Sequence, residues 1–279
     1  MRLRVHWPSL ASPLFLIACG TVMVYPLLWL LSSSLKPDNE IFTTVGLWPS
    51  RFAWENYVKG WYAMPSLPFS IFARNSLFVA SMTVIGQVMA ATVVGYGFAR
   101  RRFRLRKPLF ALMLGTMMLP EQALLVPRYI LFRHLDWIDT FRPLVIPPFF
   151  GGAFFIFLMI QFMRGIPREL DDAAAIDGCS AFQTFWRVIL PLSKPPVVVT
   201  GIFAFLWTWN DFLEPLVYLS DPRKFTIPLG LRLFLDNSGV VTWGGMFAMS
   251  LLSILPTMAV FFVAQRYFIE GIATTGLKG

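Results

Sequence analysis

A set of aromatic and polar side chains recurs at helical spacing within the apolar segment from Pro195 to Leu219. Its members, in chain order, are Trp207, Asn210, Asp211, Glu214 and Tyr218. Aromatic rings can stack on sugar rings, and amides and carboxylates can hydrogen-bond to hydroxyl groups. A carboxylate inside a membrane costs about 2.5 to 3.5 kcal/mol, so it normally faces protein or a water-filled cavity. The spacing therefore allows the first four to line a substrate path; the competing interpretation is that Asn210 and Asp211 fasten neighbouring helices.

The other groups of chemical interest stand alone. Glu121 is flanked by Pro120 and Pro127 in another apolar stretch, and it is either a gate or, as we favour, a residue near the membrane interface. The histidines and cysteines are His6, His134, Cys19 and Cys179. None of them has a partner at the spacing of a metal site, a catalytic triad or a disulfide framework. The sequence thus predicts no catalytic residue and no metal site.

A patterned segment, GIPRELDDAAAIDGCSAFQTFWRVILPLSKP, covers residues 165–195 and predicts two short helices. Pro167 suits the first turn of one helix, and the acidic residues that follow it complement the positive end of the helix dipole. These are Glu169, Asp171 and Asp172. Gly178 can supply the left-handed residue that ends this helix. Ser180 and Gln183 then form a capping box that opens the second helix.

The second helix carries an apolar face made of Phe182, Phe185, Trp186 and Ile189, and Pro191 is expected to end it. The first helix is nearly bare at Ala173, Ala174 and Ala175, so another backbone could approach it closely. We interpret the pair as a plug that docks in a groove of a partner protein. The alternative, equally weighted on spacing alone, is a structural elbow that packs on its own helices.

The chain that carries these residues is much more hydrophobic than a soluble domain. The 279 residues are 56% hydrophobic and 14% charged, with a mean hydropathy of +0.62, which excludes an ordinary soluble domain. About 20 apolar residues span a membrane, and six segments qualify. They are approximately 13–35, 76–99, 108–127, 143–163, 195–219 and 241–265. The predicted fold class is therefore an all-α membrane protein with about six transmembrane helices in one domain, residues 1–279.

The distribution of the net charge of +9 indicates the orientation of the spans. Lys and Arg number fourteen in the two termini and the loops on their side of the membrane, and nine in the other loops. The run Arg100 to Lys107 supplies six of the fourteen. The positive-inside rule therefore predicts that both termini are cytoplasmic and that this run faces membrane lipid. The charge comes with no nucleic-acid motif, so nucleic-acid binding is not expected.

ELDDAAAIDG followed by FWRVILP resembles the EAA loop of binding-protein-dependent ABC importer permeases. The matching positions are Asp172, Ala173, Ala174, Gly178, Ile189 and Pro191. The family usually has Glu where this chain has Asp172, which keeps the charge but shortens its reach. SSLKPDNEIF, WTWNDFLEPLVYL and QRYFIEGIATTGLKG also resemble the carbohydrate-importing, MalG-like branch of this inner membrane family.

The resemblance implies the type I ABC importer permease fold, with a core permease region at about 72–268 and a cytoplasmic coupling loop at about 165–194. It implies a multi-pass subunit of the bacterial cytoplasmic (inner) membrane that imports a sugar by alternating access. The implied partners are a second, MalF-like permease, two ATP-binding subunits, and a periplasmic or lipid-anchored solute-binding protein. ATP and Mg would be bound by the ATPase subunits, and no cofactor is expected in this chain, which has no Walker A pattern of its own.

A competing functional class is an ion-coupled secondary transporter that uses Asp211 and Glu214 as its coupling carboxylates. Such transporters often contain matching broken helices in two halves of the chain, and no internal repeat is visible here. A membrane-embedded enzyme is disfavoured because no HExxH, nucleophile-elbow or cofactor motif is present.

Overall fold

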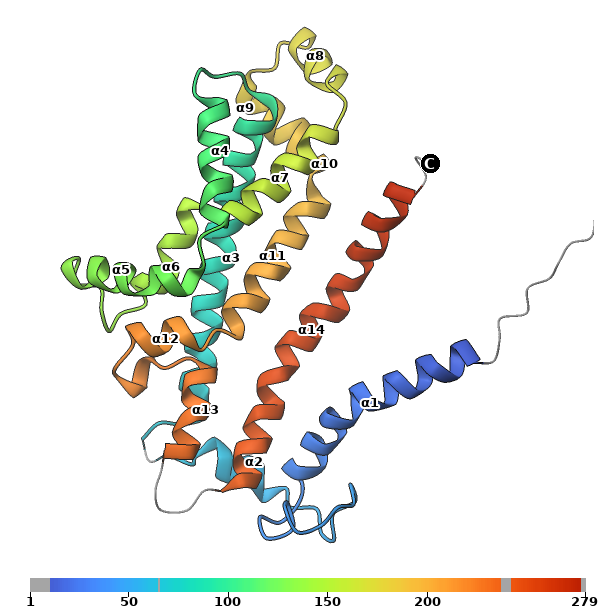
Figure 1. The fold of residues 1–279 in the computed structure, drawn as a ribbon, viewed down its shortest axis with the longest axis vertical. Coiled ribbons are helices and arrows are strands. Elements are labelled where there is room, and N and C mark those ends of the chain that lie inside the picture. Colours follow the sequence, from blue (N-terminus) through green and yellow to red (C-terminus); the bar gives the residue numbers. More distant parts are fainter. Residues whose placement is uncertain (1–10, 65, 237–241, 277–279) are drawn as a thin grey trace, which may run out of the picture. The chain divides into compact units, whose positions relative to one another are not determined.

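The computed structural model describes residues 11–64, 66–236 and 242–276 (Figure 1). All regular structure in these residues is helical, and they contain no strand. The predicted all-α class is therefore confirmed. The longer helices are α1 (Ala11–Ser34), α3 (Phe69–Arg100), α4 (Arg106–Met117), α5 (Glu121–His134), α7 (Ala153–Gly165), α11 (Lys194–Trp209), α13 (Ile227–Asp236) and α14 (Trp243–Gly276). The shorter ones are α2 (Glu55–Trp61), α6 (Arg142–Val145), η1 (Pro147–Phe150), α8 (Glu169–Ile176), α9 (Ala181–Thr184), η2 (Phe185–Ile189), α10 (Leu190–Leu192), α12 (Leu213–Tyr218) and η3 (Pro222–Lys224).

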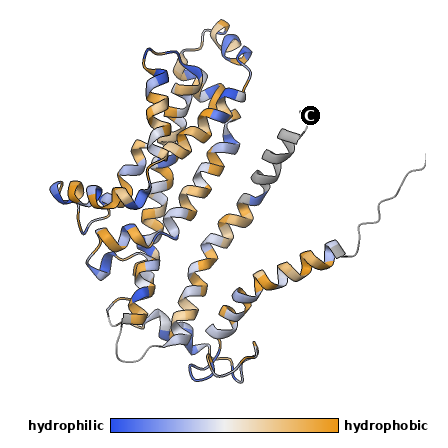
Figure 2. Cartoon of the chain, in the orientation of Figure 1, coloured by the Kyte–Doolittle hydropathy of each residue, from blue (hydrophilic) through white to orange (hydrophobic). Residues whose placement is uncertain are grey.

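Within the described residues, four helical segments are long and apolar enough to cross a membrane, and two bent helix pairs raise the number to as many as six. The four are Ser12–Ser34, Phe69–Arg100, Arg142–Gly165 and Trp243–Val263. Figure 2 shows hydrophobic residues along most of α1, many of which are exposed. A helix that is apolar on all sides needs lipid or other protein around it, as the predicted membrane class requires.

The predicted third span is broken, as its prolines indicate. α4 and α5 meet at an angle of 103° across a short connection. Pro120 lies in that connection with an extended backbone (φ −66°, ψ 130°), and a residue preceding proline avoids the helical conformation. The chain therefore turns sharply at Leu119 and continues as α5, which reaches His134 rather than ending at Pro127.

The predicted fifth span is wrong as a single helix. α11 ends at Trp209, three residues intervene, and α12 begins at Leu213. Asp211 explains the break, because its Oδ1 accepts from the backbone N–H groups of Leu213 (3.0 Å) and Glu214 (3.3 Å). A side chain that satisfies the first N–H groups of a new helix competes with continuation of the old one.

The described residues divide into two compact units. One contains residues 1–69 and 233–254, so it joins segments from distant parts of the sequence. Asp38 Oδ1 accepts from the backbone N–H of Gly244 (2.7 Å), across 206 positions. Asn56 Nδ2 donates to the carbonyls of Ser34 (3.0 Å) and Lys36 (2.8 Å), which fastens α2 to the end of α1.

The other unit, residues 70–232 and 255–279, contains most of the candidate functional residues. One buried cluster joins α3, α5 and α12 and includes Val79, Phe132 and Tyr218. A second joins α3, α7 and α11 around Met159 and Ile160. A third consists of Ala99, Met163, Ile166 and Ile189, and it lies where the segment 165–195 meets the ends of α3 and α7.

Candidate functional site

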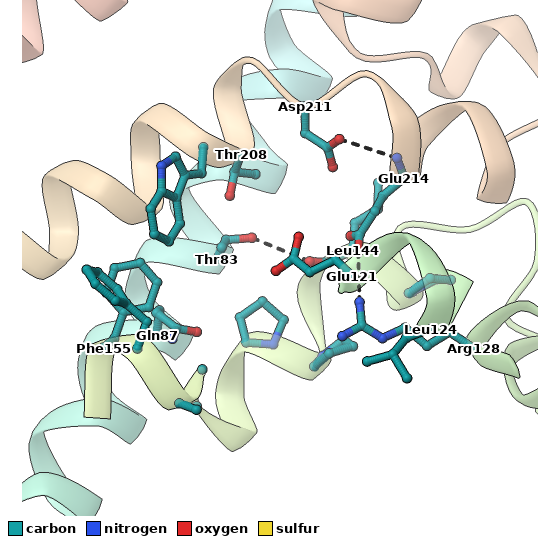
Figure 3. A pocket seen from close by; sticks show the side chains of 18 of the residues that line it. Thr83, Gln87, Glu121, Leu124, Arg128, Leu144, Phe155, Thr208, Asp211 and Glu214 are labelled. Carbon is teal, nitrogen blue, oxygen red and sulfur yellow. Dashed lines mark hydrogen bonds and ion pairs between the residues drawn. The ribbon is translucent and has the colours of Figure 1, made fainter. Parts of the chain in front are cut away.

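A cavity of about 610 Å³ lies within residues 70–232 (Figure 3). Its walls come from α3, α5, the segment from α6 to the start of α7, the end of α11, and α12. Ligand pockets usually measure about 300 to 1,000 Å³, so the volume suits a small organic solute. The broken helices create this space, because the turn after α4 and the break after α11 both bring non-helical backbone to the cavity wall.

Three carboxylates gather on one side of the cavity. Glu214 Oε1 lies 3.1 Å from Arg128 Nη1, and the two side chains are 35% and 41% exposed. Asp211 also lines the cavity, and its Oδ1 is occupied by the start of α12. Glu121 is directed into the cavity, and no hydrogen bond or ion pair reaches its carboxylate from the described residues. This side therefore offers carboxylate oxygens that are free to accept hydrogen bonds.

The opposite side of the cavity is aromatic. The ring of Trp207 lies 5.5 Å from that of Phe154 and 5.1 Å from that of Phe155, measured between centroids. Gln87 lies beside these rings. Its side-chain amide is oriented so that the oxygen accepts from the Gly152 N–H (2.6 Å) and the nitrogen donates to the Pro148 carbonyl (3.3 Å). The arrangement is an apolar surface facing a set of hydrogen-bonding groups, which suits a ligand with one apolar face and several hydroxyls.

The structure separates the five residues that were predicted to share one helix face. Trp207, Asp211 and Glu214 line the cavity. Asn210 does not; it ends α11, and its Nδ2 donates to the carbonyl of Leu206 (2.7 Å). Tyr218 is buried in the cluster around Phe132. The face divides because the chain is not helical between Trp209 and Leu213, so regular spacing does not continue across it.

Sequence reasoning missed several members of the cavity wall. Arg128 is one of the nine loop charges on the side opposite the termini, and Glu121 is expected near the membrane interface, yet both line the cavity. Their separation by seven positions placed them on one face of a helix, which was the available signal. Phe154, Phe155 and Gln87 carried no signal beyond their place in apolar spans.

In the segment 165–195, the first helix, the turn and the start of the second helix form as predicted. α8 ends just before Gly178, whose φ of +77° is the left-handed conformation that favours glycine. Ser180 and Gln183 form the capping box, with Ser180 N–H donating to Gln183 Oε1 (2.7 Å) and Gln183 N–H donating to Ser180 Oγ (3.3 Å). Both local predictions are confirmed.

The apolar face predicted for the second helix is divided. Phe185 and Ile189 are buried, whereas Phe182 and Trp186 are 70% and 52% exposed. The reason is η2, a π-helical turn that inserts an extra residue per turn and shifts the side chains out of 3.6-residue register. The helical run also continues past Pro191 to Leu192 before it breaks at Ser193.

The predicted coupling residues, which are the matching positions of the EAA-like motif together with Glu169, fall into two groups by burial. Ala174 and Ile189 are buried against this chain. The others are exposed: Glu169, Asp172, Ala173, Gly178 and Pro191. The segment therefore packs on its own helices through one side and presents an acidic and alanine surface on the other. The described residues contain no cluster of three or more His, Cys, Asp or Glu side chains placed to hold a metal ion.

Comparison with known proteins gives a consistent result. Residues 83–273 match the model of the family described as binding-protein-dependent transport system inner membrane component. A probable ABC transporter permease protein, YurM of Bacillus subtilis (strain 168), is 34% identical over 267 residues, which are 95% of this chain and 86% of the relative. The arabinooligosaccharides transport system permease protein AraQ of the same organism is 32% identical over 277 residues, 97% of this chain and 96% of the relative.

The fold also has a match among solved structures. A crystal structure of a bacterial ABC transporter, involved in the import of the acidic polysaccharide alginate, contains a chain that superposes with a TM-score of 0.83. The match covers 92% of this chain and 95% of that chain, at 21% sequence identity. The fold is therefore that of an ABC importer permease, as the sequence predicted.

Proposed function

The chain belongs to the family of binding-protein-dependent transport system inner membrane components, and from this premise we propose that it is the permease subunit of an ATP-driven importer for a carbohydrate or sugar derivative. Its relatives are named as permease subunits of ABC transport systems, one of them for arabinooligosaccharides. The proposed location is the bacterial cytoplasmic membrane, with both termini in the cytoplasm. The subunit has a transport role, and partner subunits hydrolyse ATP.

The observation that carries the carbohydrate assignment is the composition of the cavity. Trp207 supplies an aromatic surface on one side, and Asp211 and Glu214 supply oxygen acceptors on the other. Sugars have both kinds of surface, since their C–H faces stack on aromatic rings while their hydroxyls hydrogen-bond to carboxylates. We place these three residues, together with Glu121 and Arg128, along the solute path.

The exposed side of the segment 165–194 supports the coupling role. Glu169 and Asp172 present negative charge at the start of α8, and Ala173 leaves room beside them. A groove on an ATPase subunit that is lined by basic residues would suit this surface. Binding of ATP and Mg to two such subunits would move the docked segments, and the permease pair would then alternate between its two access states. A second permease and a solute-binding protein complete the proposed importer.

The proposal is tested by uptake into liposomes that contain the chain with its partner permease and ATPase subunits. We expect uptake of a labelled oligosaccharide such as arabinotriose, presented by the cognate binding protein, to require ATP inside the vesicle. Uptake driven by an ion gradient without ATP would instead support the secondary transporter that uses Asp211 and Glu214.

Variants in the same system test the path. Glu214→Gln and Trp207→Ala should lower the affinity or rate of uptake, because both side chains line the cavity. Asn210→Ala is a neighbouring comparison, since Asn210 lies between them in sequence but outside the cavity wall. Equal uptake by all three variants at matched expression would contradict the path assignment.

A further inference from the structure

The C-terminal end of α3 contacts both halves of the segment 165–195. Arg100 Nη1 lies 2.9 Å from Asp171 Oδ2 in α8, and Arg100 Nη2 donates to the carbonyl of Ile166 (2.8 Å), which precedes α8. One turn earlier on α3, the hydroxyl of Tyr96 donates to the carbonyl of Ala181 (3.1 Å), at the start of α9. A single helix end therefore holds the segment on both sides of its central turn.

The burial of these groups makes the attachment firm. The side chain of Arg100 is 3% exposed and that of Asp171 is 26% exposed. A buried guanidinium has lost its water, so removal of its carboxylate partner is strongly destabilising. The ring of Tyr96 also packs against that of Phe185, with 4.9 Å between centroids. If the segment 165–195 moves away from its position, it must either carry the end of α3 with it or break its contacts with Arg100 and Tyr96.

The covalent connection to α11 is less direct. The helical run Ala181–Leu192 meets Lys194–Trp209 at an angle of 75°, with the break at Ser193. Such a break can absorb movement as a hinge. α3, by contrast, is helical without interruption from Phe69 to Arg100. A continuous helix transmits an axial or tilting displacement over its whole length.

The same helix forms part of the cavity wall. Val79, Thr83 and Gln87 of α3 all line the cavity. At 1.5 Å per residue, Thr83 lies about 25 Å along α3 from Arg100. One rigid element therefore connects the segment that faces the proposed ATPase with the cavity that faces the proposed sugar.

We propose that Arg100 is a positioning residue which, through its ion pair with Asp171 and with Tyr96 beside it, transmits displacement of the coupling segment to the cavity wall along α3. The inference rests on the proposed function and goes beyond it. Arg100 is buried and touches neither the exposed docking surface nor the cavity. Its role is the link between them.

The test measures cavity movement directly and needs no identified sugar. Thr83→Cys places a thiol on the cavity wall, in a chain whose native cysteines, Cys19 and Cys179, are replaced by Ser. The complex with its partner permease and ATPase subunits is reconstituted, and the labelling rate of this thiol by a membrane-impermeant maleimide is measured with and without ATP and Mg. We expect ATP to change this rate by about fivefold or more, within the usual range of coupling between sites.

Asp171→Asn is the decisive variant, because it keeps the shape of the side chain and removes its charge. We expect a lower unfolding temperature, because Arg100 loses its counter-charge, but ATP hydrolysis and ATPase retention by the folded complex within about twofold of the parent. The ATP-dependent change in Thr83→Cys labelling should be lost. Asp177→Asn is the matched control: it makes the same change at an exposed position just after α8, and it should leave the labelling response intact. Arg100→Lys keeps the charge but cannot contact Asp171 and the Ile166 carbonyl through two separate nitrogens, so it should retain only part of the ATP-dependent change in labelling.

Each other outcome has a defined meaning. If Asp171→Asn keeps the ATP-dependent change in Thr83→Cys labelling, the transmission role is overturned. The same holds if the variant is less stable but shows an unchanged labelling response for each ATP hydrolysed, because the contact would then be purely structural. Loss of ATPase retention in Asp171→Asn, matching that of the docking-surface variant Asp172→Asn, would make Asp171 a docking residue and also overturn the transmission role. Failure of the parent complex to hydrolyse ATP or to change its labelling would reject the proposed function itself, and this inference with it.

Discussion

The two arginine–carboxylate pairs associated with α3 and its cavity differ mainly in how far water reaches them. At the cavity, Arg128 and Glu214 are 41% and 35% exposed, and the neighbouring Glu121 has no partner among the described residues. At the end of α3, Arg100 is 3% exposed and is held by both Asp171 and a backbone carbonyl. Breaking the first pair should cost little, whereas breaking the second should be strongly destabilising. The same chemical pair would thus serve binding along the proposed solute path and connection in the proposed link to the coupling segment.

The largest expected effect is at the buried pair. Arg100→Ala leaves Asp171 partly buried without a counter-charge, and we expect the free energy of unfolding to fall by about 3 kcal/mol. Thermal unfolding of the purified complex in detergent measures this. A loss below about 1 kcal/mol, in the range of surface pairs, would remove the distinction between the two regions.

At the cavity, Trp207→Ala tests whether the aromatic wall acts in binding rather than in stability. Trp207 is 53% exposed, so its removal should change the unfolding temperature little. Loss of ring stacking should lower the apparent affinity for a transported sugar by about tenfold, which corresponds to about 1.4 kcal/mol. Concentration-dependent uptake measures the affinity. A destabilised protein with normal affinity would contradict the assignment.

Asp139 lies outside the spans, and changing it should have an effect on stability between those of the buried pair and the cavity pair. Burial raises its pKa, but Lys224 Nζ at 2.6 Å and the backbone N–H groups of Asp221 and Ser220 outweigh this and lower the pKa from 3.8 to about 2. Because the folded-state pKa is the lower one, the stabilisation is complete above about pH 4 and is lost as the pH falls toward 2. We expect about 1 kcal/mol after allowing for solvent screening. Asp139→Asn should show a correspondingly smaller loss of stability between pH 4 and pH 2 in chemical unfolding; equal losses would exclude the effect.

The smallest stability effect is expected at the exposed pair. Glu214→Gln should change the free energy of unfolding by about 0.5 kcal/mol or less, because both partners are partly solvated. The same variant should still slow uptake, so unfolding and uptake measured on one preparation separate the two roles. A stability loss as large as that of Arg100→Ala would show that the cavity pair is structural as well.

Features encoded over a few residues could be predicted from the sequence. Gly178 and the capping box of Ser180 and Gln183 depend on local backbone geometry, and the structure contains both. The break of the third span follows from Pro120 in the same way. The all-helical class follows from the long apolar segments.

Features that depend on distant residues could not be predicted. The pair of Arg128 and Glu214 joins positions 86 apart, and no periodicity relates them. Arg100 was one of six charges in a basic run, and nothing in the sequence distinguished the one that turns inward. The π-helical turn at Phe185–Ile189 changed which aromatic side chains are buried, because one extra residue per turn cannot be seen in a 3.6-residue pattern.

The hydrogen bond from Gly244 to Asp38 has a consequence for biogenesis. The unit that contains it is made of residues 1–69 and 233–254, so its two parts are synthesised far apart in time. α1 must enter the membrane and wait while more than 160 residues are made, before the segment that completes its unit leaves the ribosome. Contacts of such high sequence separation form late in folding. Until Gly244 is made, the carboxylate of Asp38 lacks its backbone partner, so the first part of this unit stays incomplete during most of the synthesis of the chain.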